Sequence, residues 1–309
     1  MTRLTPTPRR LQLVCVMAAI TQLTCGVWQV VDMGKIDRAA LTQNLALVFV
    51  GYWLVFGWGV AIGLHRGISH RRLNHNSIAM WICTYFGTLA VLGRPMEWAI
   101  VHRVHHQFSD SPDDPHSPQH AGFWRVFLNT WTLSPAQQRH LAKPSLARDL
   151  VSSRPIQFFQ VYYWPTIFVT WSIILLVGGY SAWISLAAWP AALSLLNTSI
   201  VNALTHRQGE VRDLPALGLL TLGETYHRAH HLEPSRQNYS GQGRLDLTGM
   251  TLDFGQKIMN LSRGLTSRRS TQELAPDRSD APDLGRNSID TSHRQIPHLP
   301  HSLRKEVIS

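Results

Sequence analysis

The sequence predicts an all-α integral membrane protein with four transmembrane helices in two hairpins and a cytosolic helical cap that carries a histidine-rich dimetal site. Three observations predict this fold class. Four long segments carry no formal charge, nine histidines fall in four short clusters, and most Lys and Arg residues lie on the side of those histidines. The mean hydropathy of -0.07 hides the apolar segments, because polar regions offset them.

The first hairpin follows a polar, basic N-terminus, residues 1–10, which we expect in the cytosol. Residues 11–31 are uncharged and long enough to cross about 30 Å of hydrocarbon. A signal peptide is the alternative, but no small-residue cleavage site closes the run. Residues 45–64 form the second predicted span. The chain then passes directly into His65, so this histidine emerges where a span leaves the bilayer.

A cytosolic insert is predicted over residues 65–157. Its residues 78–93 are apolar but short, which suits a helix that lies in the interface or dips partway into the bilayer. The second hairpin comprises spans 158–180 and 183–203, and Pro165 either kinks the first of these or marks its start. We expect residues 207–265 to form the cap. The polar tail 266–309 is expected to be disordered, with no metal role for His293, His298 or His301.

The distribution of basic residues predicts the orientation. Ten Lys and Arg lie between residues 65 and 157 and fourteen follow residue 206, whereas only Lys35 and Arg38 lie in the first opposite loop. The positive-inside rule then places the histidine clusters and both termini in the cytoplasm. This topology explains the net charge of +10, and no nucleic-acid-binding motif appears. The three cysteines form no CxxC motif, so no built-in iron–sulfur carrier or disulfide framework is predicted.

The histidine clusters are the strongest functional signal. They read HRGISH, HRVHH, NALTH and HRAHH, and contain His65, His70, His102, His105, His106, His206, His227, His230 and His231. In each HxxHH run the three histidines share one helical face. Imidazole binds iron, zinc, copper and nickel, and an iron pair is the first hypothesis. Zinc-protease chemistry is disfavoured, because HRGISH lacks the spacing and the glutamate of HExxH.

These motifs, in this order between apolar hairpins, resemble the membrane-bound fatty acid desaturases, most of all the acyl-CoA and acyl-lipid Δ9-type (stearoyl-CoA desaturase-like) branch. GLHRGISHR is similar to the family's GxHRxxSHR, and MEWAIVHRVHHQFSDSPDDPHS to its WxxxHRxHHxxxDxxxDPHs. NALTHRQGE is similar to NSxxHxxG, and TLGETYHRAHHLEP to GExxHNxHHxFP. The resemblance covers about residues 45–255.

The resemblance implies an O2-dependent diiron enzyme that introduces a cis double bond into a saturated acyl chain carried by CoA or by a lipid. All nine clustered histidines would hold two Fe2+ ions, and Asn202 would hold a metal-associated water. Trp98 would line the acyl channel, and His116 would be structural or lie near the head group. The electrons would come from a separate ferredoxin, rubredoxin or cytochrome b5-type protein, because the chain contains no haem-binding cytochrome domain.

Three positions depart from the family pattern. Arg228 stands where asparagine is usual, Leu232 and Glu233 replace the phenylalanine before Pro234, and Phe127 stands where histidine is common. None of these removes a ligand. They leave open the docking surface of the electron donor, the head-group contacts and the position of the double bond.

Further candidates come from position in the sequence. Glu224, Asp110, Asp113 and Asp114 are expected to orient histidine rings, with solvated loop acids as the alternative. Phe49 and Trp53 lie one turn apart, and Trp53 precedes His65 by about 18 Å of helix. They would form the floor of the acyl channel and set the chain length, unless they pack against neighbouring helices or lipid.

Two other functions stay open. The same histidine pattern supports a diiron hydroxylase or monooxygenase acting on a lipid or an alkane, which would leave oxygen in the product. The other alternative is a non-catalytic membrane protein that binds metal or lipid. A metal transporter should carry ionisable residues within its spans, whereas the four predicted spans here carry none.

Overall fold

The computed structural model describes residues 9–33 and 38–258. Within these ranges the fold is all-helical, with no strand and one isolated bridge between Gly241 and Arg244, in agreement with the predicted class. The predicted tail 266–309 lies outside the described residues. The elements are α1 (Arg9–Met33), α2 (Arg38–Tyr52), η1 (Trp53–Ser69), α3 (Ile78–Leu89), α4 (Pro95–Phe108), α5 (Pro118–Ala121), α6 (Phe123–Phe127), α7 (Pro135–Leu141), η2 (Pro144–Leu146), α8 (Arg154–Val161), α9 (Tyr163–Trp183), η3 (Ile184–Ala188), α10 (Trp189–Ser199), η4 (Ile200–Leu204), η5 (Arg207–Gly209), η6 (Pro215–Leu217), α11 (His227–Leu232) and a last helix over residues 247–258.

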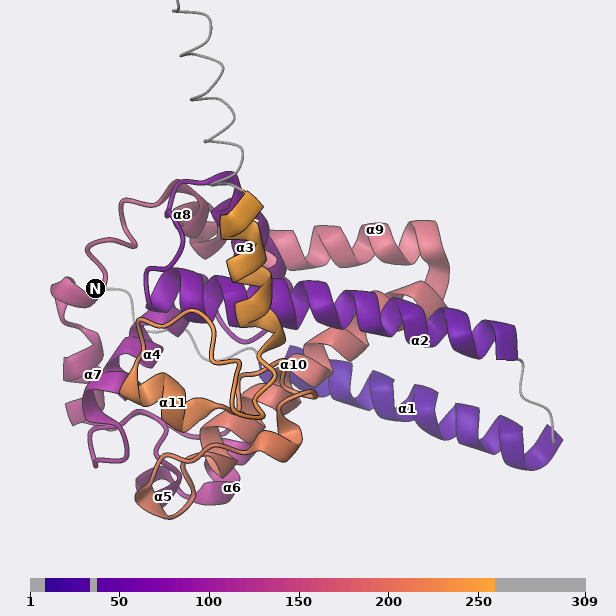
Figure 1. Cartoon of the computed structure of the whole chain (residues 1–309). Coiled ribbons are helices and arrows are strands. Elements are labelled where there is room, and N and C mark those ends of the chain that lie inside the picture. Colours follow the sequence, from indigo (N-terminus) through magenta and orange to yellow (C-terminus); the bar gives the residue numbers. More distant parts are fainter. Residues whose placement is uncertain (1–8, 34–37, 259–309) are drawn as a thin grey trace, which may run out of the picture. The chain divides into compact units, whose positions relative to one another are not determined.

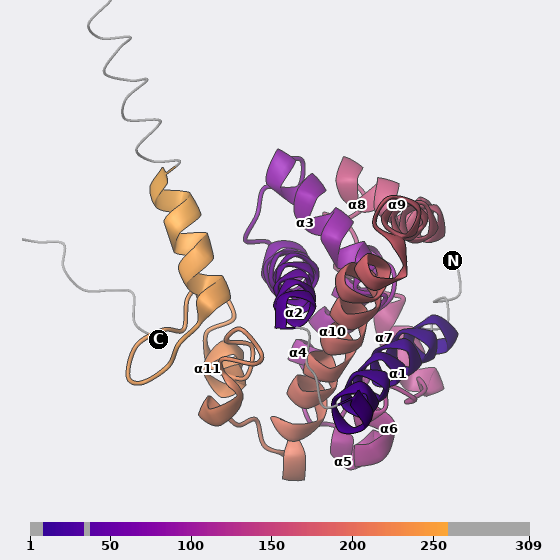
Figure 2. The ribbon, with the colours of Figure 1, turned by 90° about the vertical axis from the view of Figure 1, so that its right-hand side faces the viewer.

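Long helices extend to one side, and shorter helices gather at the other. Figure 1 shows α1, α2 and α9 extending to the right-hand side, and α4, α7 and α11 on the left-hand side. Viewed along the long helices, α10 lies between its neighbours α1 and α2 (Figure 2). Buried apolar side chains such as Phe56, Tyr163 and Trp171 fill the space between these helices.

One continuous helix carries the second predicted span into the first histidine motif. α2 passes without a break into η1, which has the wider π-helical winding that is frequent at functional sites. This helix contains the predicted span 45–64, and His65 lies in its last turns, buried. The direct passage from a long apolar helix into the first histidine motif, which the sequence predicted, is therefore present in the structure.

Among the described residues, two segments have the length and composition to cross a membrane, Leu41–Ser69 and Tyr163–Gly209. The second reverses at Gly179 (φ 71°, ψ -173°), so that α9 runs outward and α10 runs back (Figure 1). α1 contains the predicted span 11–31 but is not one of these two segments. The total of four spans therefore stays a prediction.

The third predicted span begins later than the sequence indicated. Residues 154–161 form the separate helix α8, the backbone departs from helical geometry at Tyr162, and α9 begins at Tyr163 rather than at residue 158. Pro165 lies in the first turn of α9, where its missing N–H costs no helical hydrogen bond. Pro165 thus marks the start of the helix.

The short apolar segment folds as predicted into a helix that is too short to span. α3 has 12 residues, about 18 Å, and Ser77 caps it by accepting a hydrogen bond from the Met80 N–H. It packs against η1 at Gly59 and Gly87, where a Cβ on Gly59 would lie 2.4 Å from the Gly87 nitrogen. The two glycines let the helix backbones approach closely enough to fix α3 against η1.

Candidate metal centre

All nine clustered histidines converge from four separate parts of the chain. η1 supplies His65, His70 follows its end, α4 supplies three rings, His206 follows η4, and α11 supplies the last three. Their ring nitrogens form two groups, in each of which all ligand atoms lie within 4.8 Å of one another. The five-histidine group contains His65, His70, His102, His106 and His230, and the four-histidine group contains His105, His206, His227 and His231.

Each HxxHH helix contributes to both groups. On α4 the first and last histidines, His102 and His106, belong to the five-histidine group, and His105 belongs to the other. On α11 the pattern is reversed, since only His230 belongs to the five-histidine group. On a helix, residue i+4 projects slightly to one side of residue i, whereas residue i+3 projects to the opposite side. The HxxHH spacing therefore lets each of these helices lie between the two histidine groups and contribute rings to both.

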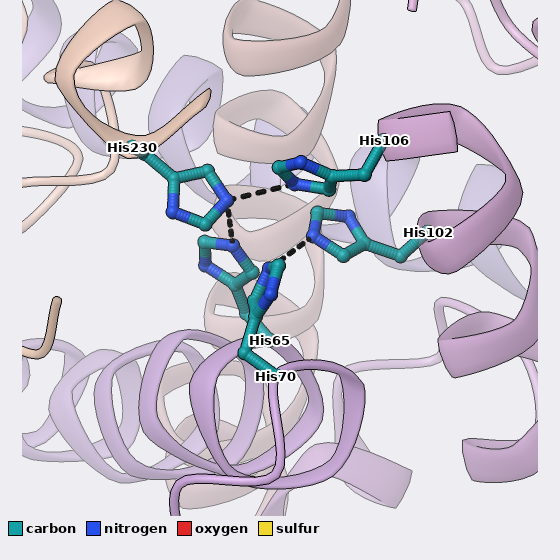
Figure 3. Close-up of side chains that lie close together, drawn as sticks. All are labelled: His65, His70, His102, His106 and His230. Carbon is teal, nitrogen blue, oxygen red and sulfur yellow. Dashed lines mark hydrogen bonds between the residues drawn. The ribbon is translucent and has the colours of Figure 1, made fainter. Parts of the chain in front are cut away.

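The Nε2 atoms in the five-histidine group meet at short distances. The Nε2 of His230 lies 2.9 Å from that of His65 and 2.8 Å from that of His106 (Figure 3). The Nε2 atoms of His70 and His102 are also 2.9 Å apart. Two nitrogens that bind one ion at about 2.1 Å and at right angles lie about 3.0 Å apart. The spacing is that of ligands around a common ion.

The four-histidine group has the same character. The Nε2 of His231 lies 3.1 Å from that of His227 and 3.3 Å from that of His105. The Nε2 of His206 is buried and has no hydrogen-bond partner. An unpaired buried nitrogen is costly, and an ion held by this group would give it a partner. The donor set and geometry of both groups therefore suit transition-metal ions.

Burial keeps seven of these imidazoles neutral. Burial, together with the neighbouring imidazoles, lowers the pKa of His70 to about 2 and that of His231 to about 3. For the same reasons the pKa values of His102, His105, His106, His227 and His230 lie far below the ordinary value. A neutral imidazole keeps a lone pair free for a metal, so protons do not compete at neutral pH.

Carboxylates lie behind both groups, where three of the four predicted acids contact ring Nδ1 atoms. Asp114 accepts a hydrogen bond from His105 at 3.0 Å, Asp110 accepts one from His206 at 3.1 Å, and Glu224 accepts one from His65. Asp113 lies elsewhere and faces His140, with 3.4 Å between the oxygen and nitrogen. Such contacts fix the tautomer and the orientation of a ligand ring.

Two contacts were not anticipated. The Tyr239 hydroxyl lies 3.1 Å from Nδ1 of His230, and the buried Arg66 lies 3.0 Å from Glu224. Arg66 lies inside the HRGISH motif. The sequence feature that could have pointed to it is a charged residue directly beside a predicted ligand. Tyr239 lies outside the histidine motifs, and no sequence pattern marked it.

A cavity of about 40 Å³ adjoins both groups and is lined by Phe56, Val60, Trp98, Val201 and Asn202 together with several of the histidines. Trp98 stacks on His102 with ring centres 5.2 Å apart. Trp98, which was predicted to line the channel, and Asn202, which was predicted to hold a metal-associated water, therefore both lie at the cavity.

Phe49 and Trp53 do not line this cavity. The Phe49 side chain is 64% exposed on α2, and Trp53 packs against the apolar core between the helices. One and two turns further along the same helix, Phe56 and Val60 form the cavity wall. His116 is buried and stacks on His105, with ring centres 4.4 Å apart. Arg228 and Leu232 lie exposed on α11, away from the rings.

The helices and their buried rings define a helical protein with two adjacent all-histidine groups suited to metal ions beside an apolar cavity. Residues 43–240 match the family model named fatty acid desaturase. The chain belongs to the fatty acid desaturase family. The resemblance drawn from the histidine motifs is thereby confirmed.

Characterised relatives carry closely related names. The chain is 30% identical to an sn-1 stearoyl-lipid 9-desaturase of Anabaena variabilis, over 71% of this chain and 84% of the relative. It is 30% identical to an enzyme of the same name from Synechocystis, over 69% of each chain. It is 29% identical to Delta-9 acyl-lipid desaturase 2 of Arabidopsis thaliana, over 66% of this chain and 73% of the relative.

Proposed function

We propose that the chain is an O2-dependent acyl desaturase that introduces a cis Δ9 double bond into a saturated acyl chain esterified to a lipid. The observation that carries the proposal is the convergence of nine histidines in two groups beside a cavity with an apolar wall. The relatives, named as acyl-lipid 9-desaturases, support the substrate class and the position of the double bond.

Two iron ions would be held by the two histidine groups, one ion by each. Bound iron would supply what no side chain can, the reduction of O2 and the oxidation of an unactivated methylene pair. The reaction balances when O2 takes two hydrogen atoms, that is two electrons and two protons, from the acyl chain, and two more electrons and two more protons from outside, giving two water molecules. The outside electrons require a separate redox protein.

The residues of the chain would position the substrate and keep water away. Phe56, Val60 and Val201 offer an apolar wall to the acyl chain, and Trp98 holds the face of His102 beside it. The cavity has room for a few water molecules, so an acyl chain enters only when this wall moves. Asn202 faces the same cavity and would hold a metal-associated water there.

The proposal includes the membrane topology. The chain would cross the bilayer four times in two hairpins, with the histidine groups, the insert 65–157, the cap 207–265 and both termini in the cytoplasm. The two candidate membrane segments and the family support a membrane protein. The distribution of Lys and Arg supports this orientation.

Expression in a host without desaturases, followed by fatty acid profiling, tests the function. A new cis Δ9 fatty acid in the membrane lipids, and about two iron ions per purified chain, are the expected results. A product that retains oxygen would assign a hydroxylase instead. An unchanged lipid profile when the protein is loaded with iron and supplied with an electron donor would contradict the proposal.

A further inference from the structure

The buried Arg66 connects the residues that hold His65 and His230, two histidines of the candidate metal site that lie far apart in the sequence. Arg66 is 2% exposed and lies next to His65 on η1. Its guanidinium contacts Glu224 at 3.0 Å and both oxygens of Asp246 at 3.1 Å, and it also donates to the Thr248 hydroxyl. Among the described residues, the two carboxylates are the only ion-pair partners of this cation.

The first link leads to His65. Glu224 places one oxygen against Arg66 and the other against Nδ1 of His65. The carboxylate is thus held from one side while it orients a ring on the other. His65 presents its Nε2 to the five-histidine group (Figure 3).

The second link leads to His230. Asp246 is fully buried and accepts hydrogen bonds from the backbone N–H groups of Tyr239, at 2.9 Å, and Gly249, at 2.8 Å. It thereby fixes the backbone at Tyr239. The Tyr239 hydroxyl then accepts a hydrogen bond from Nδ1 of His230 at 3.1 Å and donates to the Glu233 carbonyl at 2.8 Å.

Both links end in the same group of ligands. The Nε2 atoms of His65 and His230 lie 2.9 Å apart in the five-histidine group. Two rings of the four-histidine group, His105 and His206, have other carboxylate partners, Asp114 and Asp110, and no ion pair joins either acid to Arg66. Arg66 with Glu224 and Asp246 leaves one net negative charge behind the five-histidine group, which favours a cation in front of it.

We propose that Arg66 is a positioning residue for the five-histidine group, acting on His65 through Glu224 and on His230 through Asp246 and Tyr239. Retention of one of the two ions thus depends on residues 239–248, which follow the last histidine motif. This inference rests on the proposed metal-binding function.

The test measures metal, not turnover. Full-length wild-type protein and the variants Tyr239→Phe, Asp246→Asn and Arg66→Lys are purified in detergent, and iron per chain and its rate of release to a chelator are measured. Tyr239→Phe is expected to speed the release of one ion about 10- to 100-fold, since contacts behind ligands tune affinity by this amount. Asp246→Asn and Arg66→Lys are expected to leave about one ion per chain.

Two controls separate positioning from general stability. Tyr163→Phe removes the hydroxyl of another buried tyrosine, which accepts a hydrogen bond from the Gly93 N–H and contacts no histidine, and should leave both ions in place. Asp110→Asn should weaken the ion of the other group, so that Asp110→Asn combined with Tyr239→Phe affects both. Elution as a monodisperse species shows that each variant is folded.

The two hypotheses fail differently. Wild-type protein that binds no iron would contradict the proposed function. A second outcome would contradict only the role of Arg66 and leave the proposed function standing. In that outcome the wild-type protein binds two ions, and the folded variants Tyr239→Phe, Asp246→Asn and Arg66→Lys release both ions at the wild-type rate. An isolated ferric ion in the electron paramagnetic resonance spectrum of Asp246→Asn, absent from the wild type, would support the selective loss of one ion.

Discussion

At the scale of single residues, the two nitrogens of a ring in the site have different partners. In His65, His105 and His206 the Nδ1 atom faces a carboxylate, which leaves Nε2 free to face an ion. For these three rings, this arrangement gives Nδ1 a hydrogen-bond partner while Nε2 points into its histidine group. We therefore expect the acids behind the rings to affect metal affinity.

Loss of one ring from either group should abolish activity. His105→Ala removes a ligand from the four-histidine group, and His230→Ala removes one from the five-histidine group. Each is expected to reduce new unsaturation in the expression host to the background level, because one ion loses a ligand. Membrane insertion should be unchanged, as measured by fractionation of the host cells. Full desaturation by either variant would exclude that ring as a ligand.

Two neighbouring aspartates offer a matched comparison. Asp114 is buried and holds His105, whereas Asp113 is partly exposed and faces only His140 among the described residues. Asp114→Asn should weaken metal binding about 10- to 100-fold, because the ring loses its anionic partner. Asp113→Asn should bind metal as the wild type does. Equal affinities in a chelator competition would show that Asp114 does not support a ligand.

At the scale of elements, the helices are placed by a few backbone features. Gly179 adopts φ 71° and ψ -173°, a region that side chains exclude, and this lets the chain reverse between α9 and α10. The reversal sends α10 back toward the histidines. η4 then follows with Asn202, and His206 comes directly after it.

Gly179→Ala should therefore destabilise the protein by about 1–3 kcal/mol, the usual cost of forcing a side chain into such a conformation. Gly255→Ala is the control, because Gly255 lies in the last helix with open space around it and has no positive φ. It should leave stability unchanged or slightly raised. Thermal unfolding of both variants in detergent measures the difference, and equal midpoints would contradict the role of Gly179.

The role of the cavity wall on η4 can be tested by making the same substitution at two positions, one in the wall and one outside it. Val201→Phe fills space beside Asn202, and it should lower kcat/KM for a long-chain acyl lipid about tenfold or more, a cost of about 1.4 kcal/mol. Val177→Phe makes the same change on α9, where Val177 is 85% exposed, and should leave kcat/KM unchanged. Equal values for the two variants would show that this cavity does not receive the substrate.

At the scale of the whole molecule, reporter fusions test the proposed membrane topology of four spans. Fluorescent-protein fusions after residues 206 and 309 should fluoresce in bacteria, because both positions are predicted to be cytoplasmic. Alkaline phosphatase fusions after residues 35 and 181 should be active, because these positions are predicted to lie on the other side. Active phosphatase after residue 206 would contradict the four-span topology.

Much of the fold and the site followed from the sequence because the signals were local. Uncharged runs predicted long helices, and the HxxHH spacing on α4 and α11 predicted rings on one helical face. The division of each motif between the two histidine groups was not predictable, because it depends on how α4 and α11 are placed relative to η1. Tyr239 was missed for the same reason, since Asp246 and Arg66 position it from distant parts of the chain.

The split of each HxxHH helix also determines when the site is complete during synthesis. α11 emerges from the ribosome after every other ligand-bearing segment, and it gives one ring to the five-histidine group and two to the other. A nascent chain that has not reached residue 227 therefore holds four rings of one group and only two of the other. In the proposed enzyme, both ions therefore reach their full ligand sets only after α11 has been synthesised, and a shorter nascent chain would hold neither set complete.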